Sequence, residues 1–265
     1  MGNHKTGMPA QGERNRGLQV LLPFALPALL LALWGAVTFL KLMPPLLVPS
    51  PGATFSRFVR LFSREDLLSD VTATGWRWGF GYGLGCLIGV PLGLLTGCSR
   101  RLYDATYPGL DFFRSLPVTA LFPLFLLLFG IGDGSKIAMA FAGTVFVIIL
   151  NSAYGALQAQ QTRLRAAKVF GASPWQTFRW VVFFEALPQT LAGMRTALSL
   201  SLIVVIVSEM FIGTQKGLGQ RVYDAYTVND TEKLYAVVVL TGLLGYLLNR
   251  CFVSFEDRIV FWTGK

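Results

Sequence analysis

Residues 71–96 read VTATGWRWGFGYGLGCLIGVPLGLLT, a stretch of 26 residues in which Arg77 is the one charged side chain. An apolar run of about 18 residues or more can cross the hydrocarbon core of a bilayer as a helix. From Gly81 to the residue just after this stretch, a glycine recurs at every fourth position, on one helical face: Gly81, Gly85, Gly89, Gly93 and Gly97. Because small residues let helix backbones approach closely, the stretch predicts a membrane helix packed tightly against a neighbour.

Similar runs lie on both sides of this stretch and predict an all-α, polytopic membrane protein with about six spans. Hydrophobic residues make up 53% of the 265 residues and charged residues only 14%, whereas soluble domains carry about 25% charged residues. We expect a polar tail at 1–17 and a transmembrane domain at 18–265, with its core at 70–255. The expected spans are 18–43, 71–96, 110–129, one that begins with 136–150, 187–212 and 234–255.

The distribution of charge predicts the orientation of the chain. With the N-terminus inside, the cytoplasmic segments hold 14 Lys and Arg against 6 Asp and Glu, and the external segments hold 9 against 7. Cytoplasmic loops of membrane proteins carry the excess of Lys and Arg. We therefore expect a multi-pass protein of the bacterial inner membrane with both termini in the cytoplasm. Nucleic-acid binding is not indicated by the net charge of +9, because the basic residues are scattered over short loops.

A short amphipathic helix is expected between the first two spans. Ser50 and Pro51 supply an N-cap and a proline at the first helical position. Phe55, Phe58 and Phe62 then share one face of the helix. Such a helix either lies on the outer membrane surface or packs onto the protein's own periplasmic side.

The most informative polar segment is 161–188, which reads QTRLRAAKVFGASPWQTFRWVVFFEALP. Gly171 is placed to end a first helix in the left-handed conformation. Ser173 and Gln176 then form a capping-box pattern that starts a second helix. On the first helix, Ala166 and Ala167 present a small, flat surface on which a partner could dock. An ordinary cytoplasmic loop that happens to hold two short helices would also fit this pattern.

This segment resembles the EAA loop of binding-protein-dependent ABC importer permeases, in which Ala-Ala, a following Gly and a later Leu-Pro recur. Here these residues are Ala166, Ala167, Gly171 and Leu187-Pro188. The surrounding sequence is similar to the nitrate/sulfonate/taurine/bicarbonate branch of the family in four motifs: LPVTALFPLFLLLFGIG at 116–132, GMR at 193–195, SEM at 208–210 and GLG at 217–219. The likeness covers about 49–250, and it departs from the family pattern at Arg165, where the family has Glu.

The resemblance implies a type I ABC importer permease-like fold and a set of partners. These are a second permease copy in a homodimer, two ATP-binding subunits, a periplasmic substrate-binding protein and the lipid bilayer. The sequence contains no G-x-x-x-x-G-K-[ST] phosphate loop, so this chain is not expected to bind a cofactor, and ATP and Mg belong to the partner ATPase. Within the coupling segment, 161–186, and just beyond it, the expected coupling residues are Arg165, Ala166, Ala167, Gly171, Ala172, Ser173 and Pro188.

The solute is expected to be a small anion of the sulfonate/taurine, nitrate or bicarbonate type, with a vitamin or pyrimidine precursor as the alternative. Within the spans, Glu209 is the one deeply placed acidic residue, and an intramembrane charge is a candidate functional site. It either lines the translocation path or gate, or accepts a hydrogen bond from a neighbouring helix. Arg195 is a second path candidate, and the alternative is that its side chain extends to the cytoplasmic surface. Arg77, near the start of the second span, is expected to be an anchor at the membrane–water interface.

The two other classes of protein to compare with this sequence are a membrane enzyme and a passive channel. A membrane enzyme would need placed acids, bases or metal ligands, yet the only histidine is His4, and neither H-E-x-x-H nor G-x-S-x-G occurs in the sequence. A passive channel would not need the helix–glycine–helix segment. Co-purification with an ATPase subunit distinguishes an importer permease from a channel.

Overall fold

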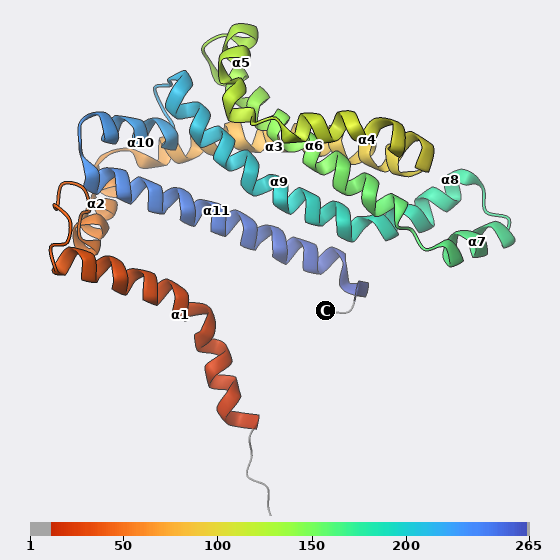
Figure 1. Ribbon diagram of the computed structural model, residues 1–265, viewed down its shortest axis with the longest axis horizontal. Coiled ribbons are helices and arrows are strands. Elements are labelled where there is room, and N and C mark those ends of the chain that lie inside the picture. The colour runs from red at the N-terminus through yellow and green to blue at the C-terminus, as the bar shows by residue number, and fades with distance from the viewer. Residues whose placement is uncertain (1–11, 264–265) are drawn as a thin grey trace, which may run out of the picture.

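The computed structural model describes the backbone of residues 12–263 and the side chains of residues 25–262 except Arg64. Most of the predicted tail lies outside the described residues, and its last part already belongs to the first helix. The described chain is built from helices and connecting turns (Figure 1). The longer helices are α1 (Gly12–Phe39), α2 (Pro51–Arg64), α3 (Leu67–Gly97), α4 (Arg100–Ser115), α5 (Phe122–Phe129), α6 (Asp133–Leu157), α7 (Gln161–Val169), α9 (Phe183–Ile212), α10 (Leu218–Thr227) and α11 (Thr231–Ile259). The shorter ones are η1 (Val118–Leu121), α8 (Pro174–Thr177), η2 (Phe178–Val182) and η3 (Phe261–Thr263).

Among the described residues, 4 helices are long and apolar enough to cross a membrane. They are α3, α6, the continuous helix Pro174–Ile212 and α11, and a fifth span results if α4 and η1–α5 together make one crossing. The first predicted span corresponds to α1, whose apolar part with described side chains, Ala25–Phe39, is shorter than a full span. The all-helical, multi-span class that the sequence predicts is confirmed.

The third predicted span, 110–129, starts too late, while the interruption expected at its two prolines, Pro117 and Pro123, is present at Pro117. The helix begins much earlier, at Arg100, and the two halves meet at an angle of 75°. Leu116 adopts an extended conformation, with φ −69° and ψ 129°. The residue that precedes a proline is disfavoured in the α-helical region, so Pro117 explains the break.

Other predicted boundaries are too narrow. The helix that begins the fourth span continues to Leu157, and the helix of the fifth span starts at Pro174 instead of Leu187. The segment 213–233, which lies between the last two predicted spans, contains the helix α10. In each case hydropathy detects only the apolar part of a helix, whereas polar residues extend it beyond the bilayer or form an amphipathic helix there.

The core is a three-helix unit in which α6 packs between α3 and α9 (Figure 1). The glycine face of α3 lies directly on α6: a Cβ atom added at Gly85 would stand 2.5 Å from Thr144 Cγ2, and one at Gly97 would stand 2.3 Å from the Ala153 carbonyl oxygen. Such distances are shorter than van der Waals contact. The two backbones can therefore approach this closely only because glycine has no side chain.

The amphipathic helix α2 packs on the protein itself. Ser50 caps its first turn by accepting a hydrogen bond from Ala53 N, at 3.2 Å. Leu61 is fully buried in a cluster formed with α3, α10 and α11, while Phe55 and Phe62 on the same helix stay exposed. Of the two alternatives left by the sequence, the structure shows packing onto the protein's own surface.

Candidate functional site

The helix pair α7–α8 is the first candidate site. Gly171 has φ +74°, the left-handed conformation that was predicted for it, and an added Cβ would meet no atom within 4 Å. The turn is closed by a hydrogen bond from Ala172 N to the Ala167 carbonyl oxygen, at 2.9 Å. Ser173 and Gln176 form the predicted capping box, with hydrogen bonds of 3.3 and 2.8 Å. The helix–glycine–helix structure is therefore confirmed.

The second helix of the pair continues without interruption into a membrane span. Thr177 and Phe178 lead into a π-helical turn, η2, which then becomes α9. Pro188 lies inside this helix, near the start of α9. Together, α8, η2 and α9 thus form one continuous helix, Pro174–Ile212.

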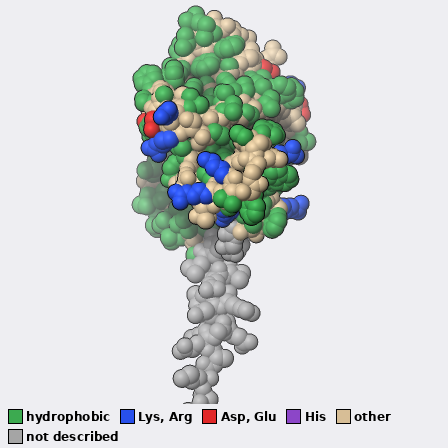
Figure 2. Space-filling view, turned by 90° about the vertical axis from the view of Figure 1, so that its right-hand side faces the viewer, with side chains coloured by type: hydrophobic (Ala, Val, Ile, Leu, Met, Phe, Trp, Pro, Cys, Tyr) green, Lys and Arg blue, Asp and Glu red, His purple; other side chains and the backbone are tan. Residues whose placement is uncertain are grey.

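The outer surface of α7 is open to a partner. Arg165 and Ala166 are exposed and Ala167 is half-buried. At the C-terminal end of α7, Val169 and Phe170 are 84% and 88% exposed, which leaves two apolar side chains without cover from the described chain. Figure 2 views the molecule from the end where α7 and α8 lie and shows Lys and Arg side chains distributed among apolar ones. This composition is typical of a surface that contacts another protein.

A cleft of about 700 Å³ separates this helix pair from the adjoining ends of α3, α4 and α6. Arg100 contributes from α4, Lys168 from α7 and Pro174 from α8. Ala172, one of the predicted coupling residues, also lines the cleft. The helix pair therefore projects from the bundle and presents two faces, one toward the cleft and one outward.

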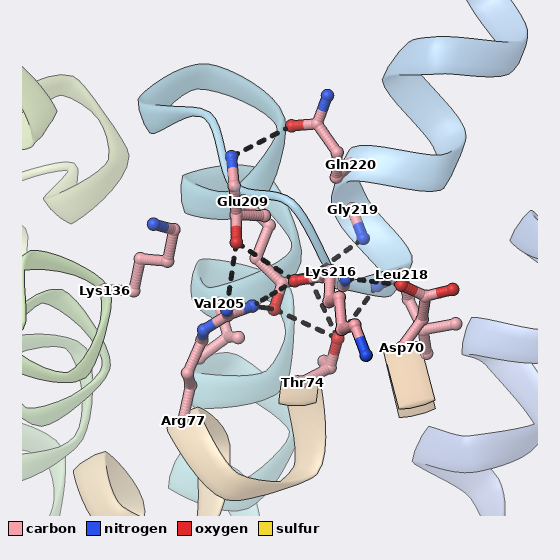
Figure 3. A network of polar contacts seen from close by, with 12 residues as sticks. Asp70, Thr74, Arg77, Lys136, Val205, Glu209, Lys216, Leu218, Gly219 and Gln220 are labelled. Atoms are coloured by element: carbon pink, nitrogen blue, oxygen red, sulfur yellow. Dashed lines mark hydrogen bonds and ion pairs between the residues drawn. The ribbon is translucent and has the colours of Figure 1, made fainter. Parts of the chain in front are cut away.

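A buried ionic network at the opposite end of the bundle is the second candidate site (Figure 3). The Glu209 side chain is fully buried, and its Oε1 atom lies 2.6 Å from a guanidinium nitrogen of Arg77. The Thr74 hydroxyl donates to Glu209 Oε2 at 2.9 Å, and Gly219 N donates to the same oxygen at 2.9 Å. Arg77 also pairs with Asp133 at 2.7 Å. The network thus joins α3, α6, α9 and α10.

This geometry contradicts the role expected for Arg77 and agrees with one of the two alternatives for Glu209. Arg77 is 4% exposed and ion-paired, so its predicted role as an interface anchor is wrong. Glu209 faces protein groups that satisfy its charge, which matches the alternative of a hydrogen bond to a neighbouring helix. A role for Glu209 in the path or gate stays a prediction.

The GLG motif is explained by the same network. A Cβ atom on Gly217, whose φ is +151°, would stand 2.6 Å from Glu209 Cδ. One on Gly219 would stand 2.1 Å from the Ile206 carbonyl oxygen. Both glycines are needed because the chain passes directly over the end of α9. The SEM and GLG motifs, which lie apart in the sequence, form a single contact.

Lys136 is a buried cation that sequence reasoning missed as a site residue. It is 1% exposed, and its Nζ atom donates to the carbonyl oxygens of Gly132 and Gly213, at 3.0 and 3.1 Å. The ammonium group therefore ties the turn before α6 to the turn after α9. In the sequence it looked only like the polar start of a span.

A further ion-pair cluster joins α2 to α10 and α11. Arg57 pairs with Glu65 at 2.7 Å and with Asp230 at 2.9 Å, and Lys233 pairs with Glu65 at 3.0 Å. Burial alone would raise the pKa values of both carboxyl groups, but hydrogen bonds and charge from Lys233 and Arg57 outweigh it. The pKa values of Glu65 and Asp230 therefore lie below their usual range. The sequence could not reveal this cluster, because the partners come from distant segments.

Arg195, the second path candidate, lies on α9 with its side chain 46% exposed. It pairs with Glu256 of α11 at 3.6 Å. The structure thus places it between two helices, away from Glu209 and from the ionic network. Its assignment to the path stays a prediction.

The fold and the first site define a class: a multi-pass membrane subunit with an exposed helix pair built into one of its spans. Residues 89–262 match the family described as "Binding-protein-dependent transport system inner membrane component", and the chain belongs to this family. It is 28% identical to the taurine transport system permease protein TauC of Escherichia coli (strain K12), over 93% of this chain and 91% of that protein. It is 29% identical to the nitrate import permease protein NrtB of a Synechocystis strain, over 72% and 69% of the two chains.

Among solved structures, a chain of the MetNI methionine ABC transporter in an inward-facing conformation has the same fold, with a TM-score of 0.63 and 24% identity. The likeness covers 75% of this chain and 96% of that one. The predicted family, and the nitrate/sulfonate/taurine branch within it, are confirmed.

The chain is therefore the inner-membrane permease component of an ABC importer, and ATP hydrolysis takes place on a separate subunit. An ATPase subunit and a binding protein are the partners that this role implies. No cofactor is expected for a permease of this family.

Proposed function

We propose that two copies of this chain form the translocation path for a small anionic solute of the sulfonate/taurine, nitrate or bicarbonate type. The proposal is supported by the names of the relatives, which include a taurine permease and a nitrate permease. A vitamin or pyrimidine precursor is the alternative cargo. The solute class is tested by measuring uptake of the radiolabelled solute with unlabelled taurine, nitrate or bicarbonate as competitor. If none of the three anions lowers this uptake, the proposed solute class is contradicted.

The α7–α8 end faces the cytoplasm in this proposal, and both chain termini lie on the same side. The basic side chains near this end, Arg163, Arg165, Lys168 and Arg179, fit the excess of Lys and Arg on cytoplasmic segments. The ionic network and α10 then lie at the periplasmic end, where the binding protein delivers the solute.

The proposed transport depends on coupling between this chain and the ATPase subunit. The supporting observation is the helix pair itself: an exposed α7, the Gly171 turn, and a capped α8 that runs into α9. A rigid element of this kind can pass a movement of the ATPase to the span. Ala167 is the docking point, because a half-buried small residue between exposed neighbours admits close contact with another chain.

Two pairs of variants test this coupling. Ala167→Trp adds bulk at the docking point, and Ala167→Ser keeps the site small. Gly171→Val places a β-branched residue at φ +74°, whereas Gly171→Asn introduces a residue that tolerates the left-handed conformation. Uptake, ATPase activity and pull-down of the ATPase subunit are measured together in lipid.

We expect Gly171→Val to lower uptake by about five- to 150-fold, which corresponds to the roughly 1–3 kcal/mol that a strained backbone conformation costs. Ala167→Trp should lower uptake by blocking close contact with the ATPase. Ala167→Ser and Gly171→Asn should stay close to the unmodified protein. All four variants leave the spans unchanged, so they should insert and assemble equally. Unmodified values of all three readouts in both disruptive variants would refute the assignment of α7–α8 as the coupling element.

A further inference from the structure

An ion pair connects α7 to α9, which lie on either side of α8 and the π-helical turn in the sequence. Arg163 lies in the first turn of α7, and Glu185 lies in the first turn of α9. The Arg163 guanidinium contacts Glu185 Oε1 directly. These residues were not singled out by their sequence pattern, since the family motif draws attention to the Ala-Ala pair between them.

The surroundings of Glu185 show that the carboxylate needs this partner. Its side chain is only 13% exposed and its Oε1 atom is buried. Trp180, Phe184 and Trp262 line the adjoining cavity of about 460 Å³, so aromatic groups dominate the surroundings. A carboxylate in such surroundings is costly to leave unpaired.

Arg163 differs from Glu185 in that it remains accessible to water, with its side chain 60% exposed. The pair is therefore formed by a solvent-accessible cation and a largely buried anion. Neighbouring Leu164 anchors the same turn of α7 through apolar contact with the cluster that contains Val182 and Ala186. One charged contact and one apolar contact thus fix the start of α7 to the base of the span.

The backbone route between the helix pair and the span passes through η2, Phe178–Val182. A π-helical turn inside a longer helix breaks the regular hydrogen-bond ladder, occurs frequently at functional sites and is a common cause of a kink. A displacement of α8 can be absorbed there as bending. The Arg163–Glu185 contact reaches α9 beyond this turn, so it provides a second route that does not depend on the stiffness of η2.

We propose that Arg163 and Glu185 form a brace that makes α7 and the first turn of α9 move together when the ATPase pushes on the helix pair. Both are positioning residues: they touch neither solute nor nucleotide and act through the orientation of α7. The inference rests on the proposed coupling role of α7–α8 and deepens it.

The test uses the assembled importer in lipid, with Glu185→Gln, Arg163→Gln and the exchange Arg163→Glu/Glu185→Arg. Arg163→Lys keeps the positive charge and serves as the conservative variant. Arg101→Gln removes a basic charge from the nearby, exposed start of α4 and is the matched control. Each sample is examined for ATPase pull-down, for ATP hydrolysis and for uptake.

We expect both single neutral variants to retain the ATPase subunits and to hydrolyse ATP, while uptake per ATP falls about tenfold. This factor is what a loss of roughly 1.4 kcal/mol in the coupling contact would produce. Arg163→Lys should recover at least half of the coupling, the exchange should recover it in part, and Arg101→Gln should not change it.

Three outcomes would overturn the brace. One is normal uptake per ATP in both neutral variants. Another is loss of the ATPase from both, which would make the pair part of the docking surface. The third is failure of both Arg163→Lys and the exchange to recover coupling in monodisperse complexes. If Ala167→Trp and Gly171→Val block uptake in the same assay, each of these outcomes removes only the brace and leaves the proposed coupling role intact.

Discussion

The contact between α3 and α6 gives a quantitative prediction at Gly93. An added Cβ atom would stand 2.5 Å from the Ile149 carbonyl oxygen and 2.6 Å from Ser152 Cβ. Backbone and Cβ atoms cannot swing away as the end of a long side chain does. Gly79 on the same helix is the matched control, because a Cβ atom there would meet nothing within 4 Å.

The expected magnitude follows from these distances. Ordinary contact begins at 3.4 Å, so Gly93→Ala requires the helices to separate locally by roughly 1 Å. Overpacking of this kind costs about 1–3 kcal/mol, while Gly→Ala within a helix contributes about 0.5–1 kcal/mol of stability. Gly93→Ala should therefore be net destabilising by up to about 2.5 kcal/mol, Gly93→Leu by more, and Gly79→Ala should be neutral or slightly stabilising.

The assay is thermal unfolding of the purified complex in nanodiscs, followed by size-exclusion chromatography of each heated sample. At about 2–4 °C per kcal/mol, Gly93→Ala should lower the apparent melting temperature by several degrees. Gly93→Leu should lose the assembled complex, whereas Gly79→Leu should retain it. Equal stability of Gly93→Leu and Gly79→Leu would refute the claim that the glycine face sets the distance between α3 and α6.

Three further predictions follow from the charged residues and the orientation. Glu209→Gln weakens the pairing of buried Arg77, so uptake should fall more than the amount of assembled complex does, and normal uptake in an intact complex would exclude a need for the charge. The lowered pKa values of Glu65 and Asp230 give stability that is complete above the usual carboxyl pKa of about 4 and is lost as the pH falls through the lower folded values. The melting temperature should therefore fall in acid. This fall should be smaller when the Glu65 and Asp230 carboxyl groups are both replaced by amides. Finally, an impermeant thiol reagent in intact cells should label a cysteine at Lys216 but not one at Ser173, and the reverse result would invert the orientation.

Several local features were predictable from the sequence because neighbouring residues decide them. Gly171 must reverse the chain after α7, and Ser173 with Gln176 must cap α8, since these interactions act over a few residues. The family motifs are likewise read from local order along the chain. The bend after Leu116 was foreseeable only in part: Pro117 marked an interruption, but its angle depends on what the two halves pack against.

Burial and pairing of charges were decided by the tertiary structure. Arg77 lies 132 residues before Glu209 in the sequence, and their contact exists only because α6 holds α3 and α9 together. The same holds for Arg163 and Glu185, which meet because the chain reverses at the Gly171 turn. The sequence alone determined that the chain forms a membrane-embedded helical protein with a close-packing glycine face and a helix–glycine–helix segment, since hydropathy and capping are local properties. Only the tertiary structure decided which charges are satisfied, because the partner that makes a buried charge tolerable is supplied by a different helix.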